Sequence, residues 1–415
     1  MTWSSQTVRE ASRTGNFGRV IRLARLSAGI SQQQLGDACG ISQSAVSRLE
    51  NQRTGAYDMT VLARAATHLR IPMRLVGLAD QLATHPDDNV ERRSFLAGAA
   101  AIAATPALTQ PAPPEAGPTA QLATLRMATT AFRRLDGMTP SRHLIEPVLA
   151  HLRMTQTLTS EAQGDRDRAR YAAAASETAS LAGWLSWDMG DLGSARTWYG
   201  ASITAARRSG DSLLSAYQLG SLAQLEGHVG NNTQALALIA SARRQLGQAV
   251  PAIATAWLST VEALAHAEVG AATAAEKALR AAEEATDRIG VEEPPPWPWV
   301  FPFSHAKVAA CRLSCGARLG RPQWVTTAQD AAGAMLSSGH EKQRAQLVLD
   351  LAFGQLASGR IDGAFALATR ALEIGLRYRS GRTVERARAL RRAYTSPTPP
   401  RVVRDFDEQL HGVYL

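Results

Sequence analysis

The chain has 415 residues, a length that predicts two or three folded units at roughly 100–200 residues per domain. A hydrophobic content of 45% favours folding over most of that length, and only three Cys exclude a disulfide framework. So few Cys favour a reducing cytoplasm, and no apolar run reaches the roughly 18–20 residues of a membrane span, so we expect a cytoplasmic protein that does not enter a membrane. The net charge of +9 is concentrated in two basic stretches, residues 1–80 and 377–404, which is typical of a protein that binds a polyanion. The second stretch alone would equally fit a surface for an acidic partner or a solvated helix face.

Apolar positions at helical spacing predict five short helices near the N-terminus, over residues 17–29, 32–39, 43–50, 60–69 and 74–82. Ser31 and Gln34 form a capping-box pattern at the start of the second helix. Gly40 supplies a tight turn, and Ser42 caps the third helix. The residues of the second and third helices expected to face the core are Leu35, Ala38, Cys39, Val46 and Leu49.

A short helix, a tight glycine turn and a second short helix make a helix-turn-helix unit. The segment QQQLGDACGISQSAVSRLENQRT, residues 32–54, resembles the Cro/C1-type (Xre-family) DNA-binding domain, and the resemblance covers about residues 17–77. It implies that residues 43–50 form a recognition helix that lies in the major groove of DNA. It also implies an ion pair between Arg25 and Glu50 that ties the first helix to the recognition helix.

The resemblance places a set of polar side chains where they would meet DNA. Gln43 can bond adenine through its amide, and Arg48 can pair with guanine or with a phosphate. Gln32 would bond a phosphate at the N-terminus of its helix. The alternative for each residue, taken alone, is a solvated polar side chain. The predicted DNA-binding residues are Gln32, Ser42, Gln43, Ser44, Ser47, Arg48, Asn51 and Arg53.

A linker over residues 83–118 is predicted to follow the DNA-binding domain, which we assign to residues 14–82. The linker contains several Pro and the segment RRSFL, residues 92–96. RRSFL resembles a twin-arginine export motif, but export signals begin a chain, and this segment follows some 90 residues that are predicted to fold. We therefore expect a docking segment whose apolar residues pack on a neighbouring domain.

From residue 119 the sequence predicts helices only, with glycines at a period near forty and one ten-residue excess at the stretch 290–303. The periodic glycines are Gly190, Gly230, Gly270, Gly320 and Gly359. Each period holds two helices that cannot bury their apolar faces alone and must stack on their neighbours. The predicted fold class is all-α: a helix-turn-helix domain joined to a tetratricopeptide-like α-solenoid over residues 119–395, with a C-terminal tail at 396–415.

Seven of the eight Trp lie between residues 184 and 324. On the inner face of a solenoid they would bind a ligand, whereas between helices they would be core anchors, as we expect of Trp184, Trp198 and Trp257. The Pro-interrupted stretch around Trp297 cannot be a regular helix, and would cap a pocket, wedge between repeats or form a dimer contact. The predicted effector-binding residues are Trp187, Trp297, Trp299, Phe301 and Phe303.

Together these parts resemble a family of actinobacterial regulators in which a Cro/C1-type domain precedes a tetratricopeptide-like array. The resemblance implies a transcriptional regulator that binds a palindromic double-stranded DNA operator as a homodimer and responds to a peptide or small-molecule effector. The alternative is a DNA-tethered scaffold or antitoxin-like regulator controlled by a protein partner. Enzyme signatures and zinc-type Cys/His spacings are missing from the sequence, so we expect no catalytic activity, no cofactor and no metal site.

Overall fold

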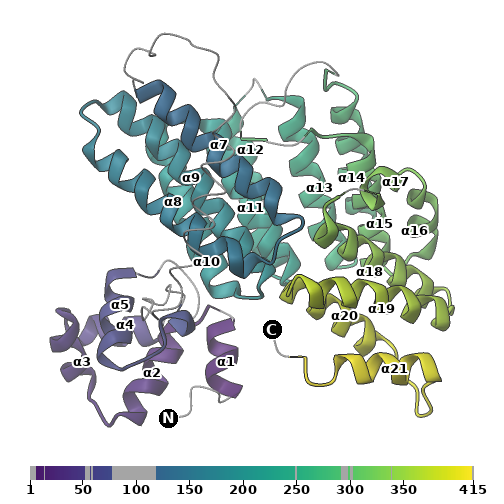
Figure 1. Cartoon of the computed structure of the whole chain (residues 1–415), viewed down its shortest axis with the longest axis horizontal. Coiled ribbons are helices and arrows are strands. Elements are labelled where there is room, and N and C mark those ends of the chain that lie inside the picture. The colour runs from purple at the N-terminus through teal and green to yellow at the C-terminus, as the bar shows by residue number, and fades with distance from the viewer. Residues whose placement is uncertain are drawn as a thin grey trace, which may run out of the picture. The chain divides into compact units, whose positions relative to one another are not determined.

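The computed structural model describes residues 6–13, 15–51, 57, 59–76, 118–247, 250–290, 298–299, 302–337 and 339–413. Over these residues the secondary structure is helical and contains no strand, which confirms the all-α prediction (Figure 1). None of the helices in the described ranges is long and apolar enough to cross a membrane. The chain divides into two compact units, Met1–Thr124 and Leu125–Leu415, and each is described by itself.

The N-terminal unit begins with short helices around one core. They are α1 (Gln6–Arg13), α2 (Phe17–Ser27), α3 (Gln32–Cys39), α4 (Gln43–Asn51), α5 (Met59–His68) and the 3₁₀ turn η1 (Met73–Val76). Helix α1 was not predicted from the sequence, and its Val8 and Ala11 are buried in the same core as the other helices. The described part of the predicted fifth helix is only the turn η1, and residues 77–82 lie outside the described residues.

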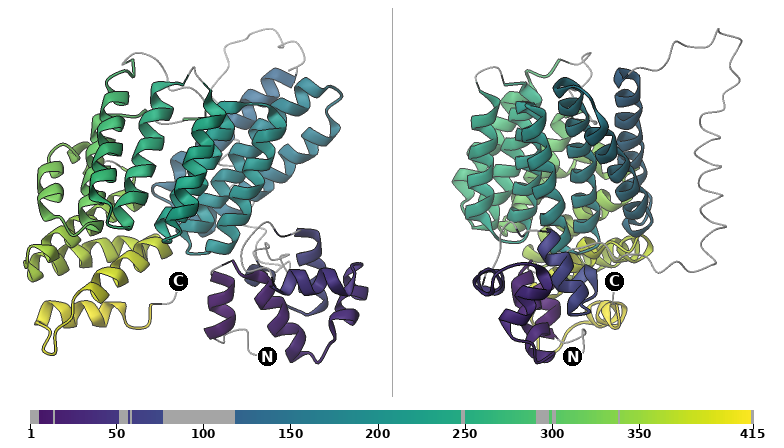
Figure 2. Two further views of the ribbon diagram at one scale, coloured as in Figure 1. Left: turned by 180° about the vertical axis from the view of Figure 1, so that it is seen from behind. Right: turned by 90° about the vertical axis from the view of Figure 1, so that its left-hand side faces the viewer.

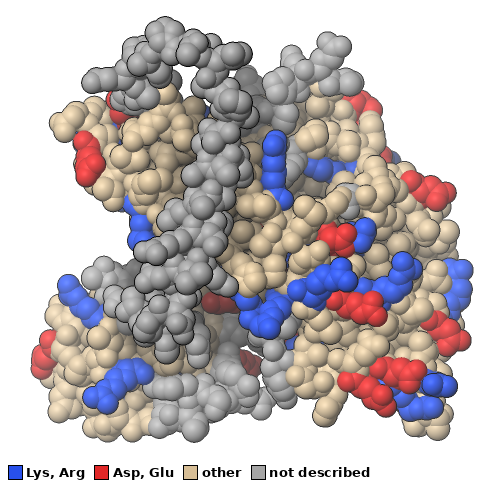
Figure 3. Space-filling view, viewed as in Figure 1, with Lys and Arg blue, Asp and Glu red and all other residues tan. Residues whose placement is uncertain are grey.

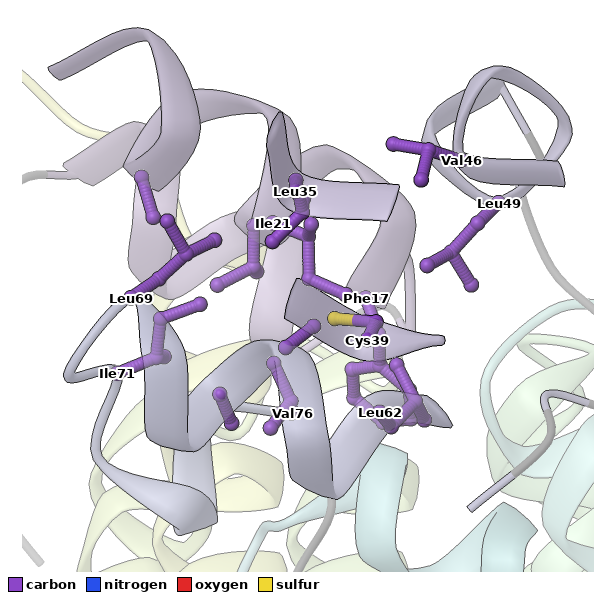
Figure 4. Packing of buried hydrophobic residues seen from close by; sticks show 14 of the residues in the cluster. Phe17, Ile21, Leu35, Cys39, Val46, Leu49, Leu62, Leu69, Ile71 and Val76 are labelled. Carbon is purple, nitrogen blue, oxygen red and sulfur yellow. The ribbon is translucent and has the colours of Figure 1, made fainter. Parts of the chain in front are cut away.

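The core of this unit follows the predicted apolar stripes, with one exception. Figure 4 shows Phe17 and Ile21 of α2 packed against Leu35 of α3 and Leu62 of α5. Ala38 was expected to face inward, but it is exposed. The inner stripe of α3 instead consists of Leu35, Gly36 and Cys39. At roughly 100° per residue the centre of that stripe lies about 100° round the helix from Ala38, so Ala38 points away from the core.

The C-terminal unit is an array of helices that starts within α7. Its helices are α7 (Pro118–Asp136), α8 (Ser141–Glu161), α9 (Asp165–Asp188), α10 (Leu192–Ser209), α11 (Ser212–His228), α12 (Asn232–Leu246), α13 (Ala252–Glu268), α14 (Ala272–Thr286), α15 (His305–Arg318), α16 (Pro322–Gln329), α17 (Gly333–Leu336), α18 (Glu341–Ala357), α19 (Ile361–Arg377), α20 (Gly381–Ala393) and α21 (Arg401–Leu410). Successive helices pack as hairpins that lie side by side (Figure 2).

The hairpin turns carry the periodic glycines that the sequence analysis identified. Gly190, Gly230 and Gly270 have φ values of +83°, +85° and +76°, and Gly320 and Gly359 have +61° and +74°. Only glycine adopts this left-handed conformation without strain, so the glycine period marks the end of the first helix of each hairpin. The ten-residue excess falls between α14 and α15, outside the helices. The tetratricopeptide-like character of the repeats stays a prediction.

The array has an inner layer that closes on itself. The first helices of the hairpins, α9, α11, α13, α15, α18 and α20, each pack on the next, and α20 packs back on α9. The second helices each pack on two successive first helices, as α10 does on α9 and α11 and α12 does on α11 and α13. In Figure 1, α19 and α20 run across the lower end of the array.

A cluster of buried polar side chains joins the first helices of the array to its last ones, and we call it the closing cluster. It consists of Asp136, Ser141, Asp188, Lys342 and Ser380. The Lys342 ammonium, on a side chain that is 1% exposed, donates to Asp136, to Ser141 Oγ at 2.8 Å and to Asp188 Oδ2 at 3.1 Å. Ser380 Oγ donates to Asp188 Oδ1 at 2.7 Å. The cluster ties α7, α8 and α9 to α18 and to the start of α20.

The segment predicted as a C-terminal tail contains helix α21. Val403 and Phe406 of this helix are buried with Phe365 of α19 in one apolar cluster. Arg391 of α20 pairs with Asp407, with Nη2 and Oδ2 2.9 Å apart. Basic and acidic side chains alternate over the lower right of Figure 3, where α18 to α21 lie. Several arginines of the basic stretch 377–404 are therefore neutralised by acidic neighbours within the array, including Arg386, Arg388 and Arg391.

Candidate DNA-binding surface and internal cavity

Helices α3 and α4 form a helix-turn-helix whose turn is set by local residues. Ser31 Oγ accepts from the backbone N–H of Gln34, and the Gln34 side chain accepts from the backbone N–H of Ser31, so the predicted capping box is present. Gly40 adopts the left-handed conformation, with φ +67°. Gly36, which the sequence analysis did not single out, lies so close to the turn that a Cβ would be 2.7 Å from the carbonyl oxygen of Ile41.

The implied ion pair between Arg25 and Glu50 is confirmed, and it extends into a relay of hydrogen bonds. Arg25 Nη2 donates to Glu50 Oε2 at 3.0 Å, and both side chains are buried. Gln32 Nε2 donates to the same Glu50 oxygen at 2.8 Å. Gln43 Nε2 then donates to Gln32 Oε1 at 2.7 Å. The relay therefore fixes the first side chain of α4 through the buried core of the unit.

The relay leaves Gln43 able to read a base. An amide side chain has two N–H donors and one carbonyl acceptor, and the bond to Gln32 uses one donor. The remaining N–H and the carbonyl oxygen are the pair that a bidentate contact to adenine N7 and N6 requires. Because Gln43 is exposed and its amide is held in place, less side-chain entropy would be lost on binding than for a free glutamine.

The other predicted DNA-binding residues divide between exposed and structural positions. Ser44, Arg48 and Asn51 are exposed on α4, and Ser47 is half-buried. Ser42 Oγ accepts from the backbone N–H of Ala45 at 3.2 Å, which is a capping contact at the start of α4. Arg53 lies outside the described residues. The structure thus brings Gln32, Gln43, Ser44 and Arg48 to the α3–α4 face, and their roles in binding stay predictions.

The inner ring of the array surrounds a cavity of about 660 Å³ that is open to solvent. Its lining comes from α7, α9, α11, α13, α15, α17, α18, α20 and the segment before α15. Two sets of side chains dominate it, and we name them the aromatic group and the arginine group. The aromatic group is Tyr217, Trp257, Trp299 and Phe303. The arginine group is Trp184, Trp187, His228 and Arg382.

The aromatic group is packed ring against ring. Tyr217 stacks on Trp257 with ring centroids 5.0 Å apart, and Trp299 meets both rings edge-on at 5.1 and 5.8 Å. Arg133 lies over the Tyr217 ring and donates to its hydroxyl at 3.0 Å. These arrangements are favourable for aromatic rings and present a rigid apolar wall.

The arginine group packs a guanidinium against two indoles that meet edge-on, with their ring centroids 5.3 Å apart. Arg382 lies 4.5 Å from the Trp184 ring centroid and 4.9 Å from that of Trp187. Trp187 also meets His228 edge-on at 5.1 Å. Burial and the positive charges of Arg318, Arg382 and Arg386 lower the pKa of His228 to about 3, so that imidazole is neutral at ordinary pH.

The cavity includes three of the five predicted effector-binding residues, Trp187, Trp299 and Phe303. Trp297 and Phe301 lie outside the described residues. Trp184 and Trp257 pack against apolar clusters of the array, as expected of core anchors, and both also line the cavity. Sequence reasoning also missed Tyr217 and Arg382, since no local pattern shows that helices so far apart in the chain meet around one space.

The described residues contain no group of three or more His, Cys, Asp or Glu side chains arranged to hold a metal ion. A protein-family model described as a helix-turn-helix domain matches residues 16–76. None of the curated proteins matches the chain. The family match and the geometry of α3 and α4 agree that the N-terminal unit contains a helix-turn-helix domain, the kind of domain that DNA-binding regulators carry.

Proposed function

We propose that this protein is a cytoplasmic, sequence-specific transcriptional regulator of the Cro/C1 type (Xre family), in which an effector bound by the helical array modulates DNA binding. The observation that carries the proposal is the exposed polar face of α4, whose leading residue Gln43 is held by Gln32 and the buried Glu50. A surface glutamine needs no such support to be solvated. Support of this kind serves a side chain that must meet a partner in a fixed orientation.

In the proposed complex α4 lies in the major groove. Gln43 bonds adenine N6 and N7, and Arg48, one turn further on, bonds guanine or a phosphate. The N-terminus of α3 and the Gln32 amide meet the phosphate backbone, because unpaired N–H groups and the helix dipole favour an anion there. Ser44, Ser47, Asn51 and Arg53 make flanking contacts. The proposal contains no catalytic step.

The proposed regulator is a homodimer on a palindromic operator, with half-sites about one helical turn apart. Large apolar side chains exposed on α7, α8 and the turn between them support a subunit interface on this part of the array. They are Met127, Leu135, Met138 and Met154, each between 45% and 69% exposed.

The interface is tested by the mass of the protein in solution, measured by light scattering. Met127→Glu combined with Met154→Glu is expected to raise the monomer fraction. The control is Val269→Glu, which places the same charge at an exposed apolar position elsewhere on the array. A wild-type monomer at micromolar concentration, or an unchanged dimer in the double variant, contradicts the interface.

The cavity of the array is the proposed effector site, for a peptide or a small molecule. Ligand sites are typically apolar and aromatic clefts of about 300–1,000 Å³ with a few convergent polar groups, and this cavity has both features. The cavity favours an effector-binding array over a DNA-tethered scaffold or antitoxin-like regulator, which would use an outer surface. Effector binding would change the population of DNA-binding arrangements in the dimer.

The test is DNA binding by the full chain. Binding sites are selected from a random-sequence duplex library, and affinities for the selected operator are then measured. Gln43→Ala and Arg48→Ala are each expected to weaken specific binding by about 5–150-fold, the range of a lost bidentate base contact. Arg53→Ala is expected to weaken binding to all sequences and to reduce the salt slope by about one. Wild-type affinity in both the Gln43 and the Arg48 variants contradicts the docking.

Matched controls make the same two substitutions at exposed positions of the array. Gln323→Ala on α16 and Arg392→Ala on α20 change exposed residues of the array, and both are expected to bind the operator as the wild type does. Failure of the library to yield any enriched sequence with the wild-type protein contradicts sequence-specific binding itself.

A further inference from the structure

Arg382 is a buried arginine whose hydrogen-bonding capacity is largely unused. Its guanidinium packs against the adjoining indoles of Trp184 and Trp187, and the residue is only 8% exposed. The nearest carboxylate oxygen among the described residues is Asp188 Oδ1, 3.9 Å from Arg382 Nη2. That distance is too long for a hydrogen bond, so the Coulomb attraction is retained while the donors stay open.

The neighbouring arginines of the inner layer are satisfied, which makes Arg382 distinctive. Arg318 Nε lies 3.0 Å from Glu268 Oε2. Arg386 donates through two of its nitrogens to Asp350. A buried guanidinium is expected to have such partners.

Within the described residues, the buried unpartnered polar atoms that belong to cavity-lining side chains are all N–H donors. They are Arg382 Nε, Trp187 Nε1 and Trp299 Nε1. A buried donor without a partner destabilises a fold unless something else supplies the acceptor. The cavity therefore fits a ligand that is rich in acceptors.

The charge of the lining favours the same conclusion. The cationic side chains around the cavity are Arg133, Lys307, Arg318 and Arg382, whereas Asp350 is the carboxylate among the lining residues that the structure describes. Burial lowers the pKa of Lys307 to about 8, and the arginines help to hold His228 neutral. Arg133 and Arg318 are paired with Glu177 and Glu268, so an anion that enters the cavity is attracted chiefly by Arg382 and Lys307.

The cavity is longer than a single ring system. Tyr217 of the aromatic group and His228 of the arginine group are eleven residues apart on α11, which is about 16 Å along the helix axis. Between these levels the wall is formed by small and apolar side chains of α11 and α13, among them Ala223, Val261 and Leu264.

We propose that the effector is an elongated amphipathic anion, whose carboxylate or phosphate binds Arg382 and whose apolar body extends along α11 and α13 to the aromatic group. Trp187 Nε1 donates a further hydrogen bond to the anionic end, and Trp299 Nε1 donates to an acceptor on the apolar body. This inference rests on the proposed effector site and adds its chemistry.

The test uses two probes that differ only in charge, 11-(dansylamino)undecanoate and its primary carboxamide. Binding is followed by energy transfer from Trp to dansyl, which requires the probe to lie near a tryptophan, and seven of the eight Trp belong to the array. The wild type is expected to bind the carboxylate at least about tenfold more tightly than the amide, as a charge-assisted hydrogen bond provides. Arg382→Gln is expected to reduce that preference to about one while leaving the affinity for the amide unchanged.

The control is Arg392→Gln, the same substitution at an exposed position of the same helix. It should leave both affinities as in the wild type. Because Arg382→Gln could disturb the neighbouring closing cluster, a second variant, Trp187→Phe, keeps an aromatic ring against Arg382 and removes the indole N–H together with the five-membered ring that carries it. This variant is expected to bind the carboxylate probe a few-fold more weakly and the amide probe as tightly as the wild type does. Its far-UV melting curve should match that of the wild type.

Three results overturn the inference: equal affinity of the wild type for the two probes, equal losses for both probes in Arg382→Gln and Trp187→Phe, or no binding of either probe up to about 1 mM. Operator binding is measured on the same samples without probe. If the protein binds its operator but shows no preference for the carboxylate probe, this inference is wrong and the proposed function stands. If it prefers the carboxylate probe but binds no operator, the proposed function is wrong and the anion site stands.

Discussion

Replacing Lys342 with Met tests whether the closing cluster holds the two ends of the array together. Lys342 is 1% exposed, and its ammonium bonds Asp136, Ser141 and Asp188, residues that precede it by 154 to 206 positions in the chain. Met keeps an unbranched side chain of similar length and removes the charge. The substitution leaves two buried carboxylates facing a site with no ammonium.

The expected cost follows from what remains after the substitution. Removing one partner of a buried ion pair costs about 3–5 kcal/mol, because the other charge stays buried without compensation. Asp188 retains the hydroxyls of Ser141 and Ser380 but has Arg382 only at 3.9 Å. For a unit of this size, a loss of that order lowers the melting temperature by about 10 °C.

The pKa of Asp188 predicts how the loss of stability in Lys342→Met depends on pH. In the wild type, burial would raise the pKa of Asp188, but Lys342, Arg382 and the two serine hydroxyls outweigh burial and hold that pKa below its ordinary value. Its contribution to stability is therefore present above about pH 4 and is lost as the pH falls through the depressed pKa. Without Lys342, burial raises the pKa of Asp188 in the folded state above its wild-type position. The folded variant then binds a proton more readily than the wild type does, so it gains stability as the pH falls from 7 to 5. The stability difference between variant and wild type should be larger at pH 7 than at pH 5.

Tryptophan fluorescence is the assay, because seven of the eight Trp lie between residues 184 and 324 and report the array. Urea unfolding is followed at pH 7 and pH 5, with Lys277→Met on the exposed side of α14 as the control. The control is expected to lie within about 0.5 kcal/mol of the wild type. A Lys342→Met loss below about 1 kcal/mol at pH 7, or a loss that grows on acidification, refutes the argument that this lysine closes the ring.

One glycine substitution in each unit tests close packing, and a third in the array is the control. Gly36→Ala places a Cβ 2.7 Å from the Ile41 carbonyl, so we expect the α3–α4 turn to lose about 1–3 kcal/mol, measured as faster amide hydrogen exchange over residues 32–51; unchanged protection would contradict the geometry. Gly220→Ala drives a methyl into the Trp257 indole and should lower the melting temperature of the array and alter its near-UV spectrum. Gly200→Ala, which meets open space on α10, should instead stabilise the array by about 0.5–1 kcal/mol, and equal effects of the last two changes would rule out the packing argument.

The sequence predicts the N-terminal unit well where the signals are local. A capping box needs only Ser31 and Gln34, three residues apart, and the left-handed turn needs only Gly40, so both follow from the sequence. The pair between Arg25 and Glu50 spans 25 residues and followed from resemblance, not from any spacing. Helix α1 was missed because its inner face is small, and its burial depends on contacts with α2 and η1 that no local pattern records.

In the array, the glycine period predicts the hairpins but not what lies inside them. A glycine every forty residues marks the turns whichever way the stack curves, so closure of the inner ring is not encoded in the period. The three hydrogen-bond partners of Lys342 named above show the same limit, since they come from α7, α8 and α9. Trp184 and Trp257 were expected to be core anchors because a large ring on a helix usually is one; here a ring can pack on its neighbours and still face a cavity.

Closure of the ring and the chemistry of the cavity depend on the same helix. Arg382 follows Ser380 by two residues at the start of α20, whereas the indoles that hold Arg382 belong to α9, so the arginine group exists only while α20 packs on α9. An array loosened by Lys342→Met should therefore keep its affinity for the uncharged dansyl amide, which depends on the aromatic group, and lose preference for the carboxylate. Lys277→Met should keep the preference. An undiminished preference in a Lys342→Met protein whose stability has fallen as expected would show that Arg382 is positioned without the closing cluster, and would separate the ligand site from the closure of the ring.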